Sequence, residues 1–323
     1  MTEGKLLVTG ATGFVGRRVC KFAEKIFSVR PAMRNSGNTA DGIAVGDITP
    51  KTDWSRALEG VDGVVHLAAR VHVMDDSEKD PLVAFRRVNV DGTVNLARQA
   101  ARAGVKRFVF VSSVKVNGEA TFPGQAFTPE DPAAPQDPYA ISKQEAEDEL
   151  HRLAAETGLE VVIIRPPLVY GPGVKANFLR LMKAVYKGFP LPRGLVRNKR
   201  SLVAIDNLVD LIITCVKHPA AAGQTFLVSD GQDLSTPELI RKLAYAMGRP
   251  ARLLPVPPGL LRLGGKVTGK TAEVERLIGS LQVNIGHTCD ALEWRPPVSV
   301  DEALLETGQD FVSRTENGLK ENI

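Results

Sequence analysis

The stretch TGATGFVG, residues 9–16, connects a short apolar run to a segment with helical spacing. Its three glycines, Gly10, Gly13 and Gly16, follow a GxxGxxG pattern. Gly10 permits a tight turn, Gly13 lets backbone N–H groups approach a pyrophosphate, and Gly16 lets a helix pack closely on a strand. The helix N-terminus adds partial positive charge beside the phosphates. A purely structural turn is the alternative, but the position between a predicted strand and a predicted helix favours a dinucleotide-binding turn.

The rest of the first half alternates short apolar runs with segments of helical spacing. The runs are rich in Val, Ile and Phe, which predicts buried strands. Parallel strands require crossover connections, so the alternation predicts an α/β fold with a doubly wound, parallel Rossmann sheet. The predicted strands are residues 6–9, 29–33, 43–45, 63–67, 107–111 and 161–165, and the predicted helices are residues 14–27, 54–58, 85–103 and 139–157.

The pattern changes after residue 165, where prolines separate shorter elements. We expect residues 1–170 to form the dinucleotide-binding domain, completed by later segments that include about 200–230. Residues 171–323 are expected to form a smaller C-terminal substrate-binding domain. Within that half, residues 226–229 are predicted as a late strand of the main sheet, and the polar residues 313–323 as a frayed terminus.

The composition excludes several classes of protein. The 323 residues are 43% hydrophobic and 24% charged, which is too apolar for a chain disordered throughout. The net charge of +4 is small and the basic residues form no long block, which argues against a nucleic-acid binder. Three separated cysteines, Cys20, Cys215 and Cys289, predict neither disulfides nor a metal site. Without an 18-residue apolar run or a leader, we expect no membrane span and a cytoplasmic location.

A group suited to hydride-transfer chemistry follows the fifth predicted strand. Ser113 ends that strand, and Tyr139 and Lys143, four residues apart, share one face of a predicted helix. Tyrosine has a reference pKa of about 10, and we expect the Lys143 ammonium and a positive nicotinamide ring to lower it. Tyr139 would then exchange a proton with a substrate oxygen that Ser113 also hydrogen-bonds, while Lys143 holds the nicotinamide ribose. Asp137-Pro138 is predicted to cap this helix. A YxxxK pattern on a surface helix without function is the alternative.

Residues after the second, third and fourth predicted strands are predicted to contact the cofactor. Arg34 occupies a position where a site for NAD usually carries a carboxylate, and its guanidinium suits the 2′-phosphate of NADP. A solvated loop arginine is the alternative. Asp47 and Ile48 are predicted at the adenine edge, with a plain helix cap as the alternative for Asp47. The residues after the fourth predicted strand are Leu67, Ala68 and Ala69. They are small or apolar, as is needed where the backbone passes close to a ligand.

Together these motifs resemble the extended short-chain dehydrogenases/reductases of the nucleotide-sugar epimerase/dehydratase family. The resemblance covers nearly the whole chain and includes HLAA at 66–69, NVDGT at 89–93 and RPPLVYGP at 165–172. It implies a UDP-sugar or similar nucleotide sugar in a cleft between two domains. It implies a homodimer through helices 89–103 and 139–157, in which Ile141, Leu150 and Leu153 serve the interface or simply the core. Further cofactor contacts implied by the resemblance are Thr12, Phe14, Val15, Asn89 and Pro166.

The reaction depends on the residues that follow Ser113. Dehydratases of this family carry an Asp-Glu pair there, whereas this chain has Val114 and Lys115, which cannot supply the acid and base for eliminating water. Epimerisation and reduction remain. Arg34 favours NADPH and reduction, and residues 112–119 with 69–74 resemble bacterial reductases of UDP-4-keto-6-deoxy-N-acetylhexosamines that act in O-antigen and polysaccharide precursor synthesis.

The leading prediction is therefore an NADPH-dependent reduction of the C4 keto group of a UDP-linked 6-deoxy-N-acetylhexosamine, with Tyr139 as general acid. The alternative is a UDP-hexose or UDP-N-acetylhexosamine 4-epimerase that retains NAD. A catalytically silent dinucleotide-binding scaffold is a minor alternative, because Tyr139 and Lys143 are both present. Arg200 offers a guanidinium fork to a diphosphate. The predicted substrate contacts are Val71, His72, Ser113, Lys115, Asn177, Leu191, Arg200 and Arg276, and for the last four of these a solvated surface position is the alternative.

Overall fold

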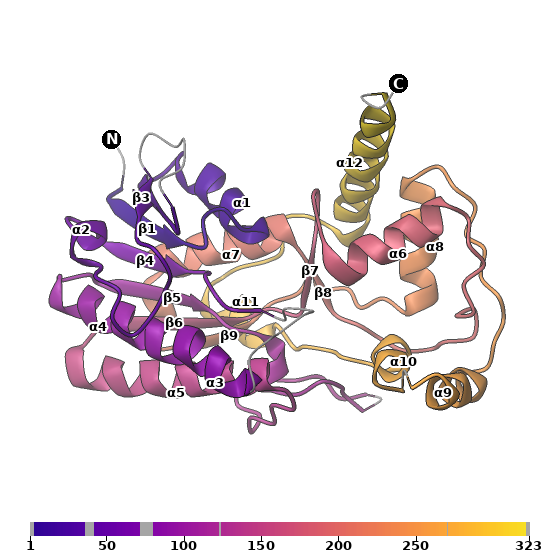
Figure 1. Ribbon diagram of the computed structural model, residues 1–323, viewed down its shortest axis with the longest axis horizontal. Helices are drawn as coiled ribbons and strands as arrows, with labels where there is room; N and C mark the ends of the chain where they lie inside the picture. Colours follow the sequence, from indigo (N-terminus) through magenta and orange to yellow (C-terminus); the bar gives the residue numbers. More distant parts are fainter. Residues whose placement is uncertain (1–2, 36–41, 72–79, 123, 270, 321–323) are drawn as a thin grey trace.

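The computed structural model describes residues 3–35, 42–71, 80–122, 124–269 and 271–320, and its larger half is a seven-stranded parallel sheet (Figure 1). The strand order is β3-β2-β1-β4-β5-β6-β9. This order confirms the predicted doubly wound sheet, since the chain leaves β1 toward one edge and returns at β4 toward the other. The strands are β1 Lys5–Thr9, β2 Ser28–Met33, β3 Ile43–Ala44, β4 Gly63–His66, β5 Arg107–Val111, β6 Glu160–Arg165 and β9 Thr225–Leu227.

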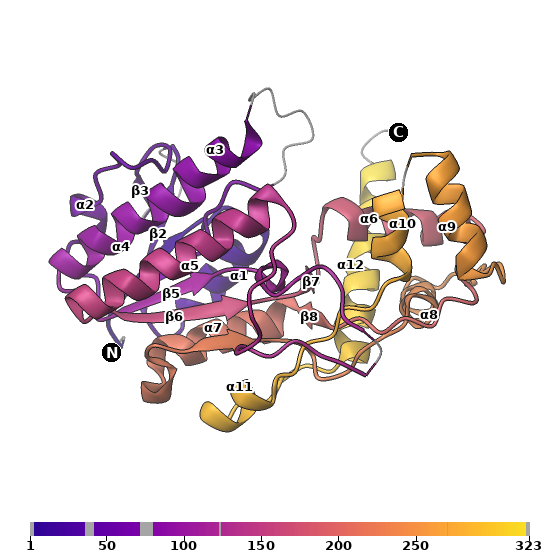
Figure 2. The ribbon, with the colours of Figure 1, turned by 90° about the horizontal axis from the view of Figure 1, so that it is seen from below.

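Helices cover both faces of this sheet (Figures 1 and 2). Strand side chains alternate between the two faces, so Leu6 and Val8 of β1 enter one core and Leu7 enters the other. One core contains α1 (Phe14–Ala23) and α7 (Ile205–Lys217). The other contains α2 (Ser55–Leu58), α4 (Thr93–Arg102) and α5 (Pro138–Thr157). Leu150 and Leu153 of α5 belong to that core, which settles their role within the chain, and Ile141 is partly buried.

The smaller half has a core of its own. Two short parallel strands, β7 (Leu168–Tyr170) and β8 (Leu202–Ala204), lie beside it. Its helices are α6 (Ala176–Tyr186), α8 (Thr236–Ala246) and α12 (Val300–Lys320), with α9 (Pro258–Val267) and α10 (Thr271–Ile278) at the far end (Figure 1). Tyr170 and Phe178 stack at 5.6 Å between ring centroids inside this core.

Several predicted boundaries are wrong. The first helix ends at Ala23 rather than at residue 27, because the chain turns there and inserts Phe27 into the core. The helix predicted at 85–103 begins at α3 (Pro81–Phe85) and passes through a π-helical segment, η1 (Arg86–Gly92), before α4. Residues 313–320 are the last turns of α12 and not a frayed end.

The larger half also recruits more of the late sequence than expected. Besides α7 and β9, it takes α11 (Gly286–Ala291) and the residues that follow. Leu292 and Trp294 are buried in the core under the sheet, and the Trp294 indole N–H donates to Asp210 of α7 at 2.8 Å. Among the described helices, none is both long enough and apolar enough to cross a bilayer.

Candidate functional site

The glycine-rich turn is shaped for a group that approaches the backbone closely. Gly10 has φ +67°, and a Cβ there would lie 2.8 Å from the backbone nitrogen of Ala68. A Cβ on Gly16 would lie 2.1 Å from the Gly10 carbonyl oxygen. Helix α1 starts directly after Gly13 without a side-chain cap, so its first N–H groups are oriented for an anion. Phe14 and Val15 form the first turn of α1 beside Thr12. The turn therefore fits the pyrophosphate of a dinucleotide.

A cavity of about 870 Å³ opens from this turn along the ends of β1, β2, β3 and β4. The structure brings most of the predicted cofactor residues together in its wall. Sequence reasoning missed two cationic residues, Arg70 and Arg87, because neither follows a glycine motif or a predicted strand directly. The predicted residues that line the cavity are Gly10, Thr12, Gly13, Arg34, Asp47, Ile48, Leu67, Ala68, Ala69 and Val71.

Arg34 and Asp47 contact each other at the open side of this cavity. The Arg34 guanidinium lies 2.7 Å from the Asp47 carboxylate, and both side chains are largely exposed. Arg34 is therefore paired with a carboxylate from the neighbouring strand end, which sequence reasoning placed at the adenine edge. An exposed pair of this kind contributes little to stability and can open for a ligand phosphate.

Behind the inner wall of the cavity, His66 is buried and hydrogen-bonded to two threonines. His66, the last residue of β4, lies between the hydroxyl groups of Thr9, at 2.7 Å, and Thr93, at 2.9 Å. Burial, with a smaller contribution from charged Lys143, lowers the pKa of His66 to about 3, so the ring is neutral. Thr9 also accepts a hydrogen bond from the Ala68 N–H at 3.2 Å. These contacts fix the strand-end backbone that passes next to Gly10.

Asn89 connects the cavity wall to the helix that carries Tyr139. Its side-chain amide accepts from the Arg70 N–H at 2.8 Å and donates to the Arg70 carbonyl at 3.0 Å. The same amide donates to the Ser142 hydroxyl, which in turn donates to the Tyr139 carbonyl at 2.7 Å. Asn89 therefore lies behind the cavity wall and holds the backbone of Arg70 and the first turn of α5 in place.

Tyr139 lies in the first turn of α5, which Asp137 caps by accepting from the Ala140 N–H at 2.7 Å. The Tyr139 ring meets Phe85 edge-on at 6.1 Å between centroids. In the protein alone, the pKa of Tyr139 is raised to about 12, first by burial and then by the Asp137 charge. The lowering expected from Lys143 together with a bound nicotinamide ring does not occur in the protein alone, because burial and the Asp137 charge both raise this pKa.

Lys143 lies one turn further along α5 and reaches the end of β5. Its ammonium donates to the Val111 carbonyl at 2.9 Å and lies 4.3 Å from the centre of the Phe110 ring. Burial lowers the pKa of Lys143 to about 7, and the charge of Glu147 opposes that shift. A cation in this position is costly unless an anion or a dipole compensates it.

Ser113 follows β5 by two residues and caps the short helix η2 (Val114–Val116), where its hydroxyl accepts from the Lys115 N–H at 3.3 Å. The next residue is held by the Pro166 carbonyl, which accepts from the Val114 N–H at 3.0 Å. Ser113, Tyr139 and Lys143 thus gather where β5 ends and α5 begins, as the spacing predicted.

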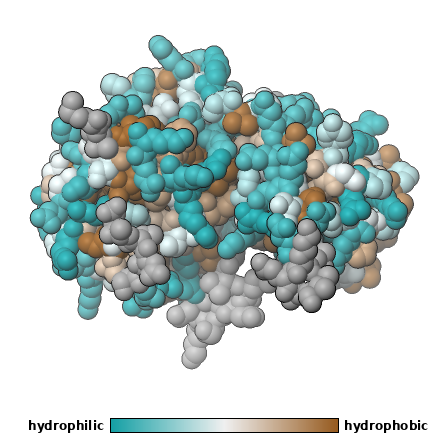
Figure 3. All heavy atoms as spheres, turned by 90° about the horizontal axis from the view of Figure 1, so that it is seen from above, coloured by the Kyte–Doolittle hydropathy of each residue, from teal (hydrophilic) through white to brown (hydrophobic). Residues whose placement is uncertain are grey.

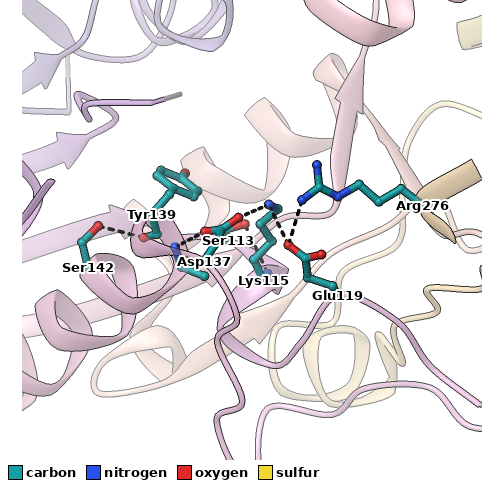
Figure 4. Close-up of polar contacts among 8 residues, drawn as sticks. Ser113, Lys115, Glu119, Asp137, Tyr139, Ser142 and Arg276 are labelled. Atoms are coloured by element: carbon teal, nitrogen blue, oxygen red, sulfur yellow. Dashed lines mark hydrogen bonds and ion pairs between the residues drawn. The ribbon is translucent and has the colours of Figure 1, made fainter. Parts of the chain in front are cut away.

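A chain of alternating charges runs from this point into the smaller half (Figure 4). The Lys115 ammonium lies 2.5 Å from the Asp137 carboxylate and 3.2 Å from that of Glu119. Glu119 also lies 3.4 Å from the guanidinium of Arg276 on α10. Lys115 and Arg276, both predicted substrate contacts, are thus joined through Glu119, which sequence reasoning did not single out.

Three further predicted substrate residues, Asn177, Leu191 and Arg200, lie in the smaller half. Arg200 donates to the carbonyls of Arg276, at 2.8 Å, and Gly279, at 3.2 Å, and burial lowers its pKa. Asn177 is exposed at the start of α6 and accepts from Arg180, and Leu191 is held by backbone hydrogen bonds to residues 252 and 254. Arg200 and Arg276 are brought together, whereas His72 lies outside the described residues.

The carboxylate of Glu147 forms a buried ion pair with Arg165, which the sequence did not predict. It accepts from the Arg165 guanidinium, with both side chains buried, and Asn117 accepts from the same guanidinium at 3.1 Å. Buried pairs of this kind fix geometry more than they add stability. This pair locks α5 onto the end of β6, where the motif RPPLVYGP begins.

Comparison with known proteins gives concordant matches. Residues 6–229 match the model of the NAD dependent epimerase/dehydratase family. A Vibrio cholerae protein named UDP-glucose 4-epimerase is 53% identical over 312 residues, 95% of both chains. An Escherichia coli O157:H7 protein named N-acetyl-alpha-D-glucosaminyl-diphospho-ditrans,octacis-undecaprenol 4-epimerase is 31% identical, over 84% of this chain and 82% of the relative. The structure of UDP-glucuronic acid 4-epimerase from Bacillus cereus with NAD has a TM-score of 0.77 at 20% identity, covering 96% and 99% of the two chains, and shows the same fold.

The matched residues include the glycine-rich turn, the cavity wall and all of Ser113, Tyr139 and Lys143. The match confirms the predicted class, an NAD(P)-dependent enzyme of the nucleotide-sugar type. The chain belongs to the NAD dependent epimerase/dehydratase family.

Proposed function

We propose that the protein interconverts the C4 epimers of a UDP-hexose or UDP-N-acetylhexosamine and retains NAD through the cycle. The observation that carries this proposal is the 53% identity, over 95% of both chains, to a protein named UDP-glucose 4-epimerase. The second relative also bears a 4-epimerase name. This proposal replaces reduction as the leading function, because the comparisons favour the alternative drawn from the sequence.

The cavity beside the glycine-rich turn is the proposed site of NAD. Gly10, Gly13 and the N-terminus of α1 would hold the pyrophosphate, and Asp47 with Ile48 would border the adenine. Lys143 would hold the nicotinamide ribose. NAD would supply the hydride chemistry: C4 of the sugar would be oxidised to the ketone, and after the sugar has rotated in the site the hydride would return to the opposite face of C4. Each of these roles is proposed from the geometry of the turn and the cavity.

Tyr139 is the proposed acid and base. As the phenolate it would take the proton of the C4 hydroxyl as the hydride leaves, and as the resulting phenol it would give that proton back as the hydride returns. Because its pKa is raised to about 12, the resting phenol is protonated. The positive charge of Lys143, one helical turn away, favours the phenolate when the base is needed. Ser113 would hydrogen-bond the same sugar oxygen.

The diphosphate of the substrate is proposed to lie between the two halves. Lys115, Arg200 and Arg276 supply positive charge there, and Glu119 neutralises two of them in this structure. An incoming diphosphate would take the place of the Glu119 carboxylate on Arg276, because two phosphates carry more charge than one carboxylate.

Reduction of a UDP-linked 4-keto-6-deoxy-N-acetylhexosamine with NADPH is the second candidate. Arg34 favours it, because a guanidinium lies at the end of β2, where NAD-specific sites usually carry a carboxylate. In the structure the Asp47 carboxylate is paired with the Arg34 guanidinium, so a 2′-phosphate would have to displace Asp47 from it. Under this candidate, Arg34→Ala weakens NADPH much more than NADH, whereas equal weakening would remove the argument.

One purified sample separates the candidates. Denaturing the protein and identifying the released nucleotide by mass spectrometry should give near-stoichiometric NAD. Incubation with UDP-glucose or UDP-N-acetylglucosamine, without added cofactor, should give the C4 epimer by NMR. If no nucleotide is retained and no epimer forms, while UDP-4-keto-6-deoxy-N-acetylglucosamine consumes NADPH, the reductase is correct and the epimerase proposal fails.

A homodimer is proposed from the resemblance to the nucleotide-sugar epimerase/dehydratase family. The helices expected at its interface are α5 and the segment that ends in α4, and Ile141 of α5 remains available there because it is only partly buried. Light scattering of the purified protein would give the mass of a dimer.

A further inference from the structure

The charges of this chain are divided unevenly along the sequence. Residues 175–205 contain eight Lys and Arg and neither Asp nor Glu, and residues 239–272 contain seven basic residues and again no acidic one. All other positions together hold 26 basic and 37 acidic residues. No more than two basic residues are adjacent anywhere in the sequence. The small net charge of +4 therefore conceals two segments that are strongly positive within a chain that is otherwise negative.

The fold places parts of the two positive segments side by side. The Leu191 N–H donates to the Arg252 carbonyl at 2.8 Å, and the Leu254 N–H donates back to the Leu191 carbonyl at 2.8 Å. The Gly194 N–H adds a bond of 2.9 Å to the Leu254 carbonyl. Together with α9, these loops form the end of the molecule that lies farthest from the parallel sheet (Figures 1 and 2). We name residues 187–199 and 249–267 the distal surface.

The distal surface also exposes aliphatic side chains. Leu260, Leu263 and Val267 are spaced three and four residues apart on α9, so they share one face of the helix. They are 59%, 58% and 80% exposed. Leu254 and Leu195, on the hydrogen-bonded loops, are exposed as well. Figure 3 views the molecule from the side of α12, away from α9, and there hydrophobic atoms are scattered among hydrophilic ones.

Basic side chains accompany this apolar face. Lys187, Arg197, Lys199, Arg252 and Lys266 are exposed on the distal surface. Arg262 of α9 is paired with the Glu275 carboxylate of α10 at 2.9 Å, so its charge is neutralised. A helix with protruding aliphatic side chains and flanking cations is the arrangement that binds in the headgroup region of a bilayer.

We propose that the distal surface docks on an anionic lipid bilayer. Cations near such a surface are attracted to anionic headgroups, and separate protruding aliphatic side chains enter the acyl boundary. The excess of negative charge in the rest of the chain is repelled by the same surface, so the molecule is oriented with its smaller half toward the lipid. A nucleic acid fits less well, because single strands are held by aromatic stacking and the exposed face of α9 is aliphatic. The proposal is independent of which reaction the site carries out.

Vesicle sedimentation with the full-length protein tests the proposal. The probes are vesicles of phosphatidylcholine alone and vesicles that contain 30% phosphatidylglycerol. We expect at least fivefold more protein on the anionic vesicles at low salt, with a decrease as salt is added. The variants Leu263→Ser/Val267→Ser and Lys187→Glu/Lys266→Glu should each lose at least fivefold of that binding, while circular dichroism and thermal unfolding remain as in the parent.

Matched controls keep the test specific. Val83→Ser changes a side chain of α3 that is 58% exposed, as Leu263 is, and Arg102→Glu reverses an exposed charge at the end of α4. Both should bind vesicles like the parent. Equal binding to the two vesicle types, no binding at low salt, or equal losses in the controls would overturn the proposal. So would binding to single-stranded RNA at least as tight as to the anionic vesicles and unaffected by Leu263→Ser/Val267→Ser.

Discussion

The Lys115 ammonium lies 2.5 Å from the Asp137 carboxylate, and this contact joins the turn after β5 to the N-terminus of α5. Lys115 is two residues from Ser113, and Asp137 is two residues from Tyr139. The pair therefore sets the position of the hydroxyl of Ser113 relative to that of Tyr139.

Two replacements of Asp137 separate its role as the cap of α5 from the effect of its charge on Tyr139. Asp137→Ser keeps a helix cap but removes the charge, whereas Asp137→Ala removes both. We expect the free energy of unfolding to fall by about 1 kcal/mol for Ala and much less for Ser. Both variants should lower the pKa of Tyr139, since the Asp137 charge raises it, and should shift to lower pH the limb of the pH–rate profile on which activity rises as Tyr139 ionises. Urea unfolding and a pH–rate profile measure the two effects, and an unshifted profile in both variants would contradict the electrostatic role.

Removal of the Tyr139 hydroxyl tests the acid–base assignment. Tyr139→Phe keeps the ring against Phe85, so folding and NAD binding should be unchanged. Turnover should fall by roughly a hundredfold or more, as for loss of a general acid. Tyr245→Phe, at a tyrosine that is 82% exposed, is the matched control and should behave like the parent. Near-normal turnover of Tyr139→Phe would remove this residue from the mechanism.

The close packing at the glycine-rich turn predicts a steep effect of one methyl group. Gly16→Ala would place a Cβ 2.1 Å from the Gly10 carbonyl oxygen, so the turn must shift. We expect a stability loss of about 1–3 kcal/mol and at least tenfold weaker NAD binding, by calorimetry. Gly264→Ala is the control, because a Cβ there meets nothing within 4 Å and alanine suits a helix interior. Unchanged NAD affinity in Gly16→Ala would show that the turn does not hold the cofactor.

Burial of the neutral His66 ring predicts that the free energy of unfolding decreases in acid. Folding lowers the pKa of its imidazole from 6.5 to about 3, so the unfolded chain binds a proton in this range that the folded chain does not. The resulting stability is present above pH 6.5 and is lost as the pH falls toward 3, by about 2 kcal/mol at pH 5. Urea unfolding at pH 7.5 and 5.0 measures it. His66→Gln, which keeps hydrogen bonds to Thr9 and Thr93, should show a pH difference smaller by that amount. The same pH difference in both proteins would exclude His66 as its source.

Local signals in the sequence predicted the sheet and the gathering of Ser113, Tyr139 and Lys143. Glycine spacing, strand-length apolar runs and a four-residue helical repeat act over a few residues, so they are readable without a structure. Contacts between distant segments carry no such signal. The pairing of Lys115 with Asp137, of Glu119 with Arg276 and of Arg165 with Glu147 spans 18 to 157 residues.

The raised pKa of Tyr139 in the protein alone could not be predicted for a related reason. Sequence showed the nearby ammonium but not the burial that dominates both groups. The roles of the predicted cofactor and substrate residues, the homodimer and the cytoplasmic location stay predictions. The identity of the reaction could not be read from Arg34 alone, because its partner Asp47 comes from another strand.

The burial of Leu292 and Trp294 beneath the parallel sheet has a consequence for how the chain is made. The chain must leave the ribosome as far as Trp294 before the half that contains the parallel sheet can close its hydrophobic interior. During synthesis, the N-terminal strands therefore wait for the C-terminal residues that shield them. Release of an incomplete chain before residue 294 would leave an open apolar face, and that fragment would be a substrate for chaperones rather than a working half-enzyme.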